Sequence, residues 1–448
     1  MNRFLTLALK FLIAAAIISS LVALTLLAID YFKTKAAFPP KTFICQVEVS
    51  LLSREEAIIR LRQAPPEKLY PPTFVFQNTG ESFAFPSKDL GIRVLPEETV
   101  DAAFATTHKD SYIRELRNRL SRNYLVLSPR LALNEDQALK VITELAQKID
   151  SPPKDASVQL DESTGGYHIT RDLPARKLLT AETLSACRNA LFEGKAAFPL
   201  LIDCAVPPRI AEALLRPHPP VYRLSAFTTY YGKHDSPNRI HNIKLIASWL
   251  NNTILLSDEV LSLAEKIGDF SAERGFKEAF VILQGELVPQ LGGGTCQIGT
   301  TLFNAVSLAD LEILSRRNHS FYFNIYPLGR DATVYPGQVD FKFKNNTGFP
   351  IMIKAVATNK KLSFRIYGTP TGKIVSFSRP TIYMLGEDGV FSPATLREVI
   401  DSDRPFRTIV TRTVKDAQGK ILTEETLRSY YKLYGEKSNV PIRRPEPR

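Results

Sequence analysis

The chain has 448 residues, of which 44% are hydrophobic and 23% are charged. At roughly 100–200 residues per domain this length allows two to four domains, and the apolar content excludes a largely disordered protein. The 57 lysines and arginines exceed the 46 acidic residues by 11, which favours anionic partners such as nucleic acid, anionic lipid or an anionic wall polymer. Because the basic residues are scattered and no nucleic-acid motif is present, we do not expect nucleic acid as a partner.

The N-terminus contains a run from Phe11 to Ile29 without a charged residue. At about 1.5 Å per residue in a helix, such a run nearly spans a hydrocarbon core of about 30 Å. A cleaved signal peptide is the alternative, but its apolar part is typically shorter, and Ala28-Ile-Asp-Tyr31 is a poor cleavage site. We therefore expect residues 1–32 to form a cytoplasmic start and a single transmembrane anchor in the lipid bilayer. The bulk of the chain would then be extracytoplasmic.

Two copies of a helix–hairpin–helix unit are predicted between residues 46 and about 215. Each copy begins with a helix-start signal, at Ser53-Arg-Glu-Glu56 and at Asn134-Glu-Asp-Gln137, and the first of these is a capping box. Alternating runs that turn at glycine follow each helix, and a second helix follows each hairpin. The predicted hairpins are 74–76 with 83–85 and 157–160 with 167–169, and the second helices begin near Leu95 and Leu179.

Residues 40–215 resemble the YoaR-like peptidoglycan-binding domain. The resemblance rests on Val47-Glu-Val-Ser50 before Ser53-Arg-Glu-Glu-Ala57, on Asp89-Leu-Gly-Ile92 and on Pro153-Lys-Asp-Ala156. It implies that the partner is peptidoglycan or another anionic wall polymer. The proline-rich stretch 207–220 then reads as the end of this region and a linker.

A glycine-rich turn precedes Cys296. Glycines 292–294 permit a tight backbone path, and the stretch after Cys296 has the apolar spacing of a helix. Cys296 would therefore lie at a helix N-terminus, where the unpaired N–H groups and the helix dipole favour a thiolate.

His319 and Asp331 are candidate partners of Cys296. His319 begins an alternating run through residue 326, and Asp331 opens a second short extended segment, which predicts the order helix, strand, strand. Transglutaminase-like enzymes use a cysteine, a histidine base and an orienting aspartate in this order. The alternatives are that Cys296 only fills a packed helix start, that His319 caps a strand, and that Asp331 pairs with Arg330. His241 is a competing base, and no metal-ligand spacing or cofactor motif is present, so we expect neither a metal nor a cofactor.

Residues 220–370 resemble the VanW family. The residues that carry this resemblance are Ser236-Pro-Asn-Arg-Ile-His-Asn242, Ala272-Glu-Arg-Gly-Phe-Lys-Glu-Ala279, Gly292-Gly-Gly-Thr-Cys-Gln297, Asn318-His-Ser320, Gly329-Arg-Asp-Ala-Thr-Val334 and Phe343-Lys-Asn-Asn346. The chain departs from the family pattern at 261–267. The resemblance implies a bacterial envelope context, which includes some glycopeptide-resistance clusters. Within these motifs we expect substrate contacts at Gly293, Gly294, Gln297, Arg239 and Arg330.

The C-terminal part is expected to be rich in strands. Residues 338–368 contain three alternating or apolar runs, and residues 371–436 form a β-rich tail with a hairpin from 406–414 to 421–431. The Pro- and Arg-rich residues 437–448 are expected to be disordered. The fold class is therefore α+β throughout the exported part. Cys187 and Cys204 are close enough in sequence to pair, but the sequence does not decide this.

Three functions agree with these observations. The chain is a wall-binding accessory protein, a cysteine-dependent amidase, peptidase or acyl transferase on wall peptides, or a scaffold for an envelope enzyme complex. The enzyme requires Cys296, His319 and Asp331 to converge in an open cleft. An accessory protein or a scaffold does not require these three residues to converge.

Overall fold

The computed structural model describes residues 2–121, 124–232, 235–283, 286–402 and 404–432. The expected disordered tail at 437–448 lies outside these residues. Helices and short antiparallel sheets are both present, which confirms the α+β class. The chain divides into two compact units, Met1–Pro153 with Pro174–Pro207 and Lys154–Leu173 with Pro208–Arg448.

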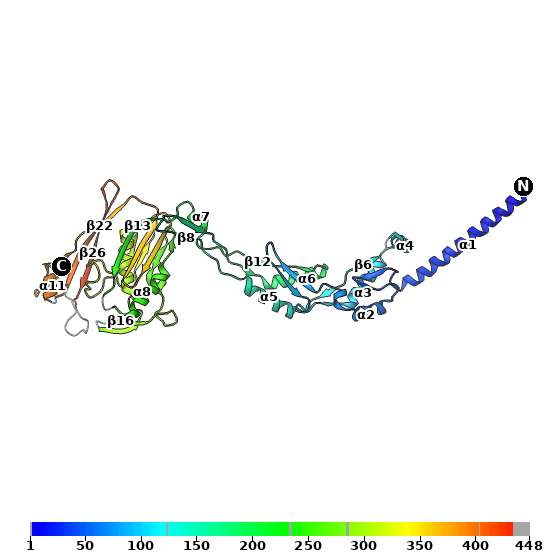
Figure 1. Cartoon of the computed structure of the whole chain (residues 1–448), viewed down its shortest axis with the longest axis horizontal. Coiled ribbons are helices and arrows are strands. Elements are labelled where there is room, and N and C mark those ends of the chain that lie inside the picture. Colours follow the sequence, from blue (N-terminus) through cyan, green and yellow to red (C-terminus); the bar gives the residue numbers. More distant parts are fainter. Residues whose placement is uncertain (1, 122–123, 233–234, 284–285, 403, 433–448) are drawn as a thin grey trace. The chain divides into compact units, whose positions relative to one another are not determined.

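The first unit begins with α1 (Asn2–Lys35), a long apolar helix (Figure 1). Its segment Leu7–Lys35 contains an 18-residue stretch with a mean hydropathy of 2.7 and no buried residue, and it is long and apolar enough to cross a membrane. Within the described residues it is the one helix of this kind. The expected N-terminal apolar helix is therefore present.

A first small core lies between α2 (Arg54–Gln63) and α3 (Pro96–Thr107). The predicted capping box is confirmed, because the Ser53 side chain accepts from the Glu56 N–H while the Glu56 carboxylate accepts from the Ser53 N–H. Ala57 and Leu61 on α2 are buried against the α3 residues Val100 and Ala103.

A second core is formed by the hairpin β3 (Thr73–Gln77) and β4 (Ser82–Pro86) together with α5 (Glu135–Ile149) and α6 (Thr180–Phe192). Strand β11 (Ala197–Pro199) extends the hairpin in parallel to β3. The Asn134 side chain caps α5 by accepting from the Gln137 N–H, as the sequence predicts. The other elements of this unit are β1 (Thr42–Ile44), β2 (Val47–Glu48), η1 (Pro66–Lys68), β5 (Arg93–Val94), α4 (Tyr112–Ser121), β6 (Leu125–Leu127), β7 (Leu131–Ala132), β10 (Lys177–Leu178) and β12 (Ile202–Asp203).

The second predicted hairpin, β8 (Ser157–Leu160) with β9 (Tyr167–Thr170), packs in the second unit. The Ala156 N–H donates to the Ile210 carbonyl at 2.8 Å, and the Tyr367 hydroxyl donates to Glu162 at 2.7 Å. The chain order helix, hairpin, helix is thus present twice, but the second hairpin belongs to a different core from the helices that flank it in sequence.

The core of the second unit lies between a four-stranded antiparallel sheet and two helices. The sheet order is β13 (Tyr222–Tyr230), β21 (Lys361–Gly368), β20 (Ile351–Ala357) and β14 (Thr253–Leu255). Helices α8 (Pro237–Leu250) and α10 (Thr295–Leu308) pack against this sheet. Figure 1 shows α8 beside it.

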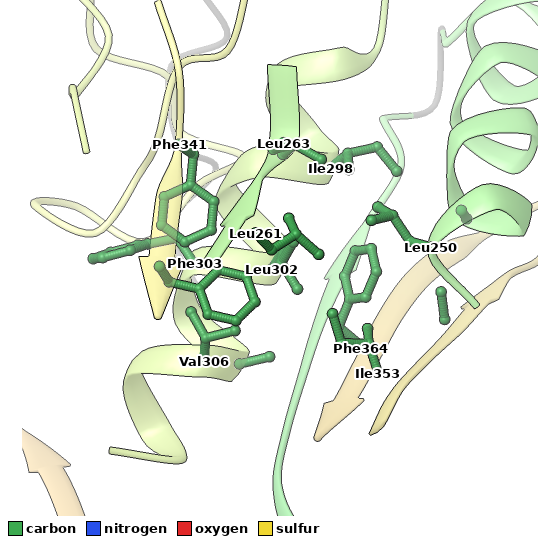
Figure 2. Packing of buried hydrophobic residues seen from close by; sticks show 14 of the residues in the cluster. Leu250, Leu261, Leu263, Ile298, Leu302, Phe303, Val306, Phe341, Ile353 and Phe364 are labelled. Carbon is green, nitrogen blue, oxygen red and sulfur yellow. The ribbon is translucent and has the colours of Figure 1, made fainter. Parts of the chain in front are cut away.

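Helix α10 is almost wholly buried at the centre of this core. Figure 2 shows its residues Leu302, Phe303 and Val306 among Phe341 and Phe364. At about 25 cal/mol per Å² of apolar surface, a central helix buried on all sides contributes a large share of the stability of the unit. Residues at its N-terminus are therefore held rigidly.

A second sheet, formed by the C-terminal residues, contains β22 (Ile374–Phe377), β25 (Phe406–Lys415), β23 (Thr381–Leu385) and β24 (Phe391–Ala394). Strand β26 (Ile421–Tyr431) pairs with β25, as predicted. Helix α11 (Leu396–Ser402) was not predicted, although Thr395 and Glu398 form the reciprocal bonds of a capping box. The remaining elements of the unit are α7 (Glu212–Leu215), β15 (Val260–Ser262), α9 (Leu263–Ile267), β16 (Glu278–Leu283), β17 (Glu286–Leu291), β18 (Glu312–Ser315) and β19 (Lys342–Lys344).

Candidate active site

The glycine-rich turn positions Cys296 in the first turn of α10. Gly294 is the N-cap of this helix and has a φ of 110°, a left-handed conformation that favours glycine. A Cβ at Gly294 would lie 2.7 Å from Ile243 on α8, and one at Gly293 would lie 2.7 Å from Ala279. The glycines therefore allow α10 to begin in close contact with its neighbours.

One face of α10 carries polar residues at intervals of four. Cys296 Sγ lies 3.7 Å from the Val334 carbonyl, Thr300 bonds both the N–H and the carbonyl of residue 332, and the Asn304 amide donates to the carbonyl of residue 330 at 2.8 Å. Four residues of helix rise about 6 Å, close to the length of two extended residues. The helix therefore holds the segment 330–334 in register along its side.

His319 and Asp331 do not lie on strands, and this part of the prediction is wrong. Residues 316–319 and 331–334 are irregular, and between them the structure has turns and one isolated bridge at Phe321. Side-chain hydrogen bonds satisfy backbone groups that a neighbouring strand would pair in a sheet. Arg316, for example, donates to the carbonyl oxygens of Gly329 and Asp331. The alternating aromatic run covers His319, and the Tyr326 ring stacks on the imidazole at 5.2 Å.

The Asp331 carboxylate is buried and accepts hydrogen bonds from three side chains. His319 Nδ1 lies 2.6 Å from Oδ2, and the His319 backbone N–H donates to the same oxygen at 2.7 Å. The Tyr431 hydroxyl donates to Oδ1 at 2.5 Å, and Arg316 approaches Oδ1 at 3.4 Å. These bonds fix the carboxylate, and the alternative pairing of Asp331 with Arg330 does not occur.

His319 joins Asp331 to Cys296. Because Nδ1 is engaged by the carboxylate, Nε2 is the ring nitrogen that remains available to Cys296, which lines the same pocket. Burial alone would raise the pKa of Cys296, but the hydrogen bond and positive charge of His319 lower it below its ordinary value. Burial alone would lower the pKa of His319, but its bonds to Asp331 and Cys296 raise it to about 9. Both shifts favour a thiolate beside an imidazolium over a neutral thiol beside a neutral imidazole.

Asp331 stabilises the imidazolium. Burial tends to raise the pKa of this carboxyl, but the hydrogen bond and charge of His319 and the Tyr431 hydroxyl lower it. Burial raises the pKa of Tyr431, which keeps its hydroxyl protonated and able to donate. No sequence motif marks Tyr431 or Arg316, which contact Asp331 from other parts of the chain.

Cys296 and His319 open into a pocket of about 1050 Å³. Aromatic rings that include Phe270, Phe323 and Tyr326 line it together with Arg239, whose guanidinium bonds Asp235 at 2.8 Å. A volume of this size accommodates a peptide or a similar ligand. Within the described residues no group of three or more metal-ligating side chains lies together.

Only some of the residues expected to contact substrate line the Cys296 pocket. Arg239, Gly294 and Gln297 line the Cys296 pocket, but the Gln297 amide already donates to Thr229 and to the Tyr230 carbonyl. Gly293 is buried, and its carbonyl accepts from Asn242. Arg330 lies outside this pocket, with its guanidinium over the rings of Phe377 and Phe227.

The first turn of α10 offers one free donor beside the thiol. The N–H groups of Thr295 and Gln297 donate to the carbonyls of Gly292 and Gly294. Among the described residues the Cys296 N–H has no acceptor. An N–H at the positive end of a helix is suited to stabilise an oxyanion formed on a carbonyl that the thiolate attacks.

All four cysteines are free, so Cys187 and Cys204 do not form a disulfide.

Comparison with known proteins identifies two regions of the chain. Residues 238–367, which contain Cys296, His319 and Asp331, match the family model described as VanW like protein. The chain thus carries a VanW-like domain over these residues. Residues 83–198 match a model described as Putative peptidoglycan binding domain, which supports a peptidoglycan-binding region before it.

Two curated relatives are similar to parts of the chain. The "Uncharacterized protein YoaR" of Bacillus subtilis is 35% identical over 162 residues, which are 36% of this chain and 53% of that protein. The "Vancomycin B-type resistance protein VanW" of Enterococcus faecalis is 26% identical over 135 residues, 29% of this chain and 49% of that protein. The chain thus spans about half the length of each relative, and no solved structure matches it. The two domain matches indicate a cell-wall-related role.

Proposed function

We propose that this protein is a cysteine-dependent amide hydrolase or acyl transferase that acts on peptidoglycan peptides. The observation that carries the proposal is that Cys296 and His319 line one open pocket while His319 Nδ1 is held by Asp331 at 2.6 Å. This is the geometry that the enzyme hypothesis requires and that a binding module or a scaffold has no need of.

The groups account for each step of acyl transfer. The Cys296 thiolate attacks the carbonyl carbon of an amide, and the oxygen becomes an oxyanion near the Cys296 N–H. The imidazolium of His319 then gives its Nε2 proton to the leaving amine as the C–N bond breaks, which leaves a thioester on Cys296. Next, His319 accepts a proton from water or from an acceptor amine, whose attack releases the acyl group and restores the thiolate. Asp331 holds the imidazole and stabilises its charged form throughout.

The substrate class follows from the other parts of the chain. Helix α1 has the length and composition of a membrane anchor, and the peptidoglycan-binding match supports an extracytoplasmic position for the bulk of the chain. Peptidoglycan stem peptides contain amide bonds that suit thiolate attack. We therefore propose that α1 spans the membrane once and that the pocket acts on wall peptides at the cell surface.

The test is to trap the thioester. The full chain is incubated with soluble stem-peptide fragments at neutral pH, quenched in acid and digested for mass spectrometry. An acyl adduct on Cys296, absent in His319→Ala, is expected, with release of an amine-bearing fragment. Cys204→Ser, which changes an exposed cysteine, is the matched control and should retain the adduct. If neither adduct nor product appears with any wall peptide, the enzymatic proposal is wrong.

A non-enzymatic wall-binding accessory protein is the second candidate, and the match of residues 83–198 favours it. In that case the full chain should co-sediment with purified sacculi, and Cys296→Ala should leave every wall phenotype unchanged. Binding that an unrelated basic protein reproduces across salt concentrations would be only electrostatic.

A further inference from the structure

We propose that α4 lies in the surface of the lipid bilayer beside the point where α1 leaves it, with its apolar side inserted and its arginines at anionic lipid headgroups. The inference rests on the proposed membrane position of α1. It concerns a surface outside the Cys296 pocket, on a helix within the matched region 83–198.

Side-chain contacts tie α4 and the residues just before it to the last turns of α1. The Tyr112 hydroxyl lies 2.8 Å from the Asp30 carboxylate and 3.0 Å from the Leu27 carbonyl oxygen. The rings of Tyr112 and Tyr31 are 5.2 Å apart, and His108 Nε2 lies 2.7 Å from the Thr34 carbonyl oxygen. Leu27 to Thr34 covers about 10 Å of helix, similar to the depth of the headgroup and acyl boundary.

Large apolar side chains of α4 are left exposed. Ile113 is 78% exposed and Leu120 is 81% exposed, and their spacing of seven places them on one side of the helix. Tyr124 and Val126, just beyond the helix, are 66% and 62% exposed. Apolar residues exposed this close to a membrane span are suited to insertion among lipid chains.

The charge of this segment fits an anionic surface. Residues 109–122 contain five basic and two acidic residues, a net charge of 5 − 2 = +3. Arg114 and Arg117 are exposed on α4, and the contact of Arg114 with Asp110 at 3.2 Å is exposed to solvent. An amphipathic helix with a basic polar side binds anionic lipid in two ways: its apolar side chains insert among the acyl chains, and its basic side chains are attracted to the headgroups.

The experiment measures tryptophan quenching by lipids brominated near the headgroup end of their acyl chains. The full chain is reconstituted in vesicles of phosphatidylcholine with phosphatidylglycerol. Leu120→Trp reports α4, Phe11→Trp reports α1, and Ile59→Trp, at an exposed apolar position of α2, is the matched control. The single native tryptophan, Trp249, supplies a background that is measured in the unsubstituted chain.

Leu120→Trp emission should fall by roughly half relative to Ile59→Trp, because its ring sits at the boundary depth. Phosphatidylcholine alone or Arg114→Gln with Arg117→Gln should reduce this quenching. If Phe11→Trp is quenched and Leu120→Trp is not, α1 is anchored and the α4 proposal is wrong. A blue-shifted but unquenched Leu120→Trp would mean that a second copy or another protein covers α4, which also overturns it. If neither is quenched, the membrane position of α1 fails together with the inference.

Discussion

The hydroxyl of Tyr431 connects the last described strand to the candidate catalytic aspartate. It donates to Asp331 Oδ1 at 2.5 Å and accepts from the Gly329 N–H at 3.1 Å. Tyr431→Phe removes one oxygen and leaves the ring, which packs against Phe406, in place. The change therefore separates hydrogen bonding from packing.

Two effects are expected from Tyr431→Phe. A hydrogen bond to a charged group contributes about 1.5–3 kcal/mol, so the free energy of unfolding should fall by about 2–3 kcal/mol. The same loss removes an O–H dipole whose hydrogen faces Asp331, so the carboxylate becomes a stronger acceptor for the imidazolium, which raises the pKa of His319 and lowers that of Cys296. The hydroxyl acts on Cys296 only through Asp331 and His319. We therefore expect only part of this free energy to appear as a change in the pKa of Cys296. That corresponds to a shift of roughly half to one pH unit, at about 1.4 kcal/mol per unit.

The assay combines denaturant unfolding with the pH dependence of Cys296 alkylation, read by mass spectrometry. Tyr383→Phe is the matched control, because Tyr383 lies on β23 of the same sheet and its hydroxyl has no hydrogen-bond partner among the described residues. It should change neither quantity. If Tyr431→Phe lowers stability and leaves the alkylation profile unchanged, Tyr431 only supports the fold and the reasoning about Asp331 is wrong.

Three further predictions follow from packing and from the histidine pKa. Gly294→Ala should destabilise the second unit by at least about 1–3 kcal/mol in thermal unfolding, because the residue has a φ of 110° and its Cβ would lie 2.7 Å from Ile243. Leu302→Ala, in the fully buried centre, should lose about 2–5 kcal/mol, whereas Leu314→Ala, at a position that is 47% exposed, should lose less than about 1 kcal/mol. Amide cleavage should decline as the pH rises through about 9, because His319 then loses the proton that it gives to the leaving amine; a rate that keeps rising above this pH would exclude His319 as the acid.

Much of the site could be predicted from local sequence. A glycine turn before a helix pattern indicated Cys296 at a helix start, and the structure has it in the first turn of α10. The polar residues Cys296, Thr300 and Asn304 are spaced by four in an otherwise apolar helix. This spacing was a further signal, because a buried helix seldom carries a polar stripe unless the stripe has partners.

The remaining parts of the site depend on contacts between distant residues. The aromatic run after His319 alternates like a strand, but with Pro327 and Gly329 at its end the chain turns and packs its rings against the imidazole. Tyr431 lies 100 residues after Asp331 and outside the matched VanW region, so no local pattern relates the two. The predicted β-rich tail therefore takes part in building the site, which its hydrophobic pattern alone does not indicate.

We propose that His319 holds Cys296 as a thiolate at neutral pH. The most direct measurement is the alkylation rate of each cysteine of the full chain against pH, read by mass spectrometry. Cys296 should react fastest near roughly pH 6–7, while the buried Cys187, whose pKa burial raises to about 12, should stay slow. His319→Ala should move the Cys296 profile to higher pH. An unreactive Cys296 at neutral pH, or a profile that His319→Ala leaves unchanged, would contradict the account.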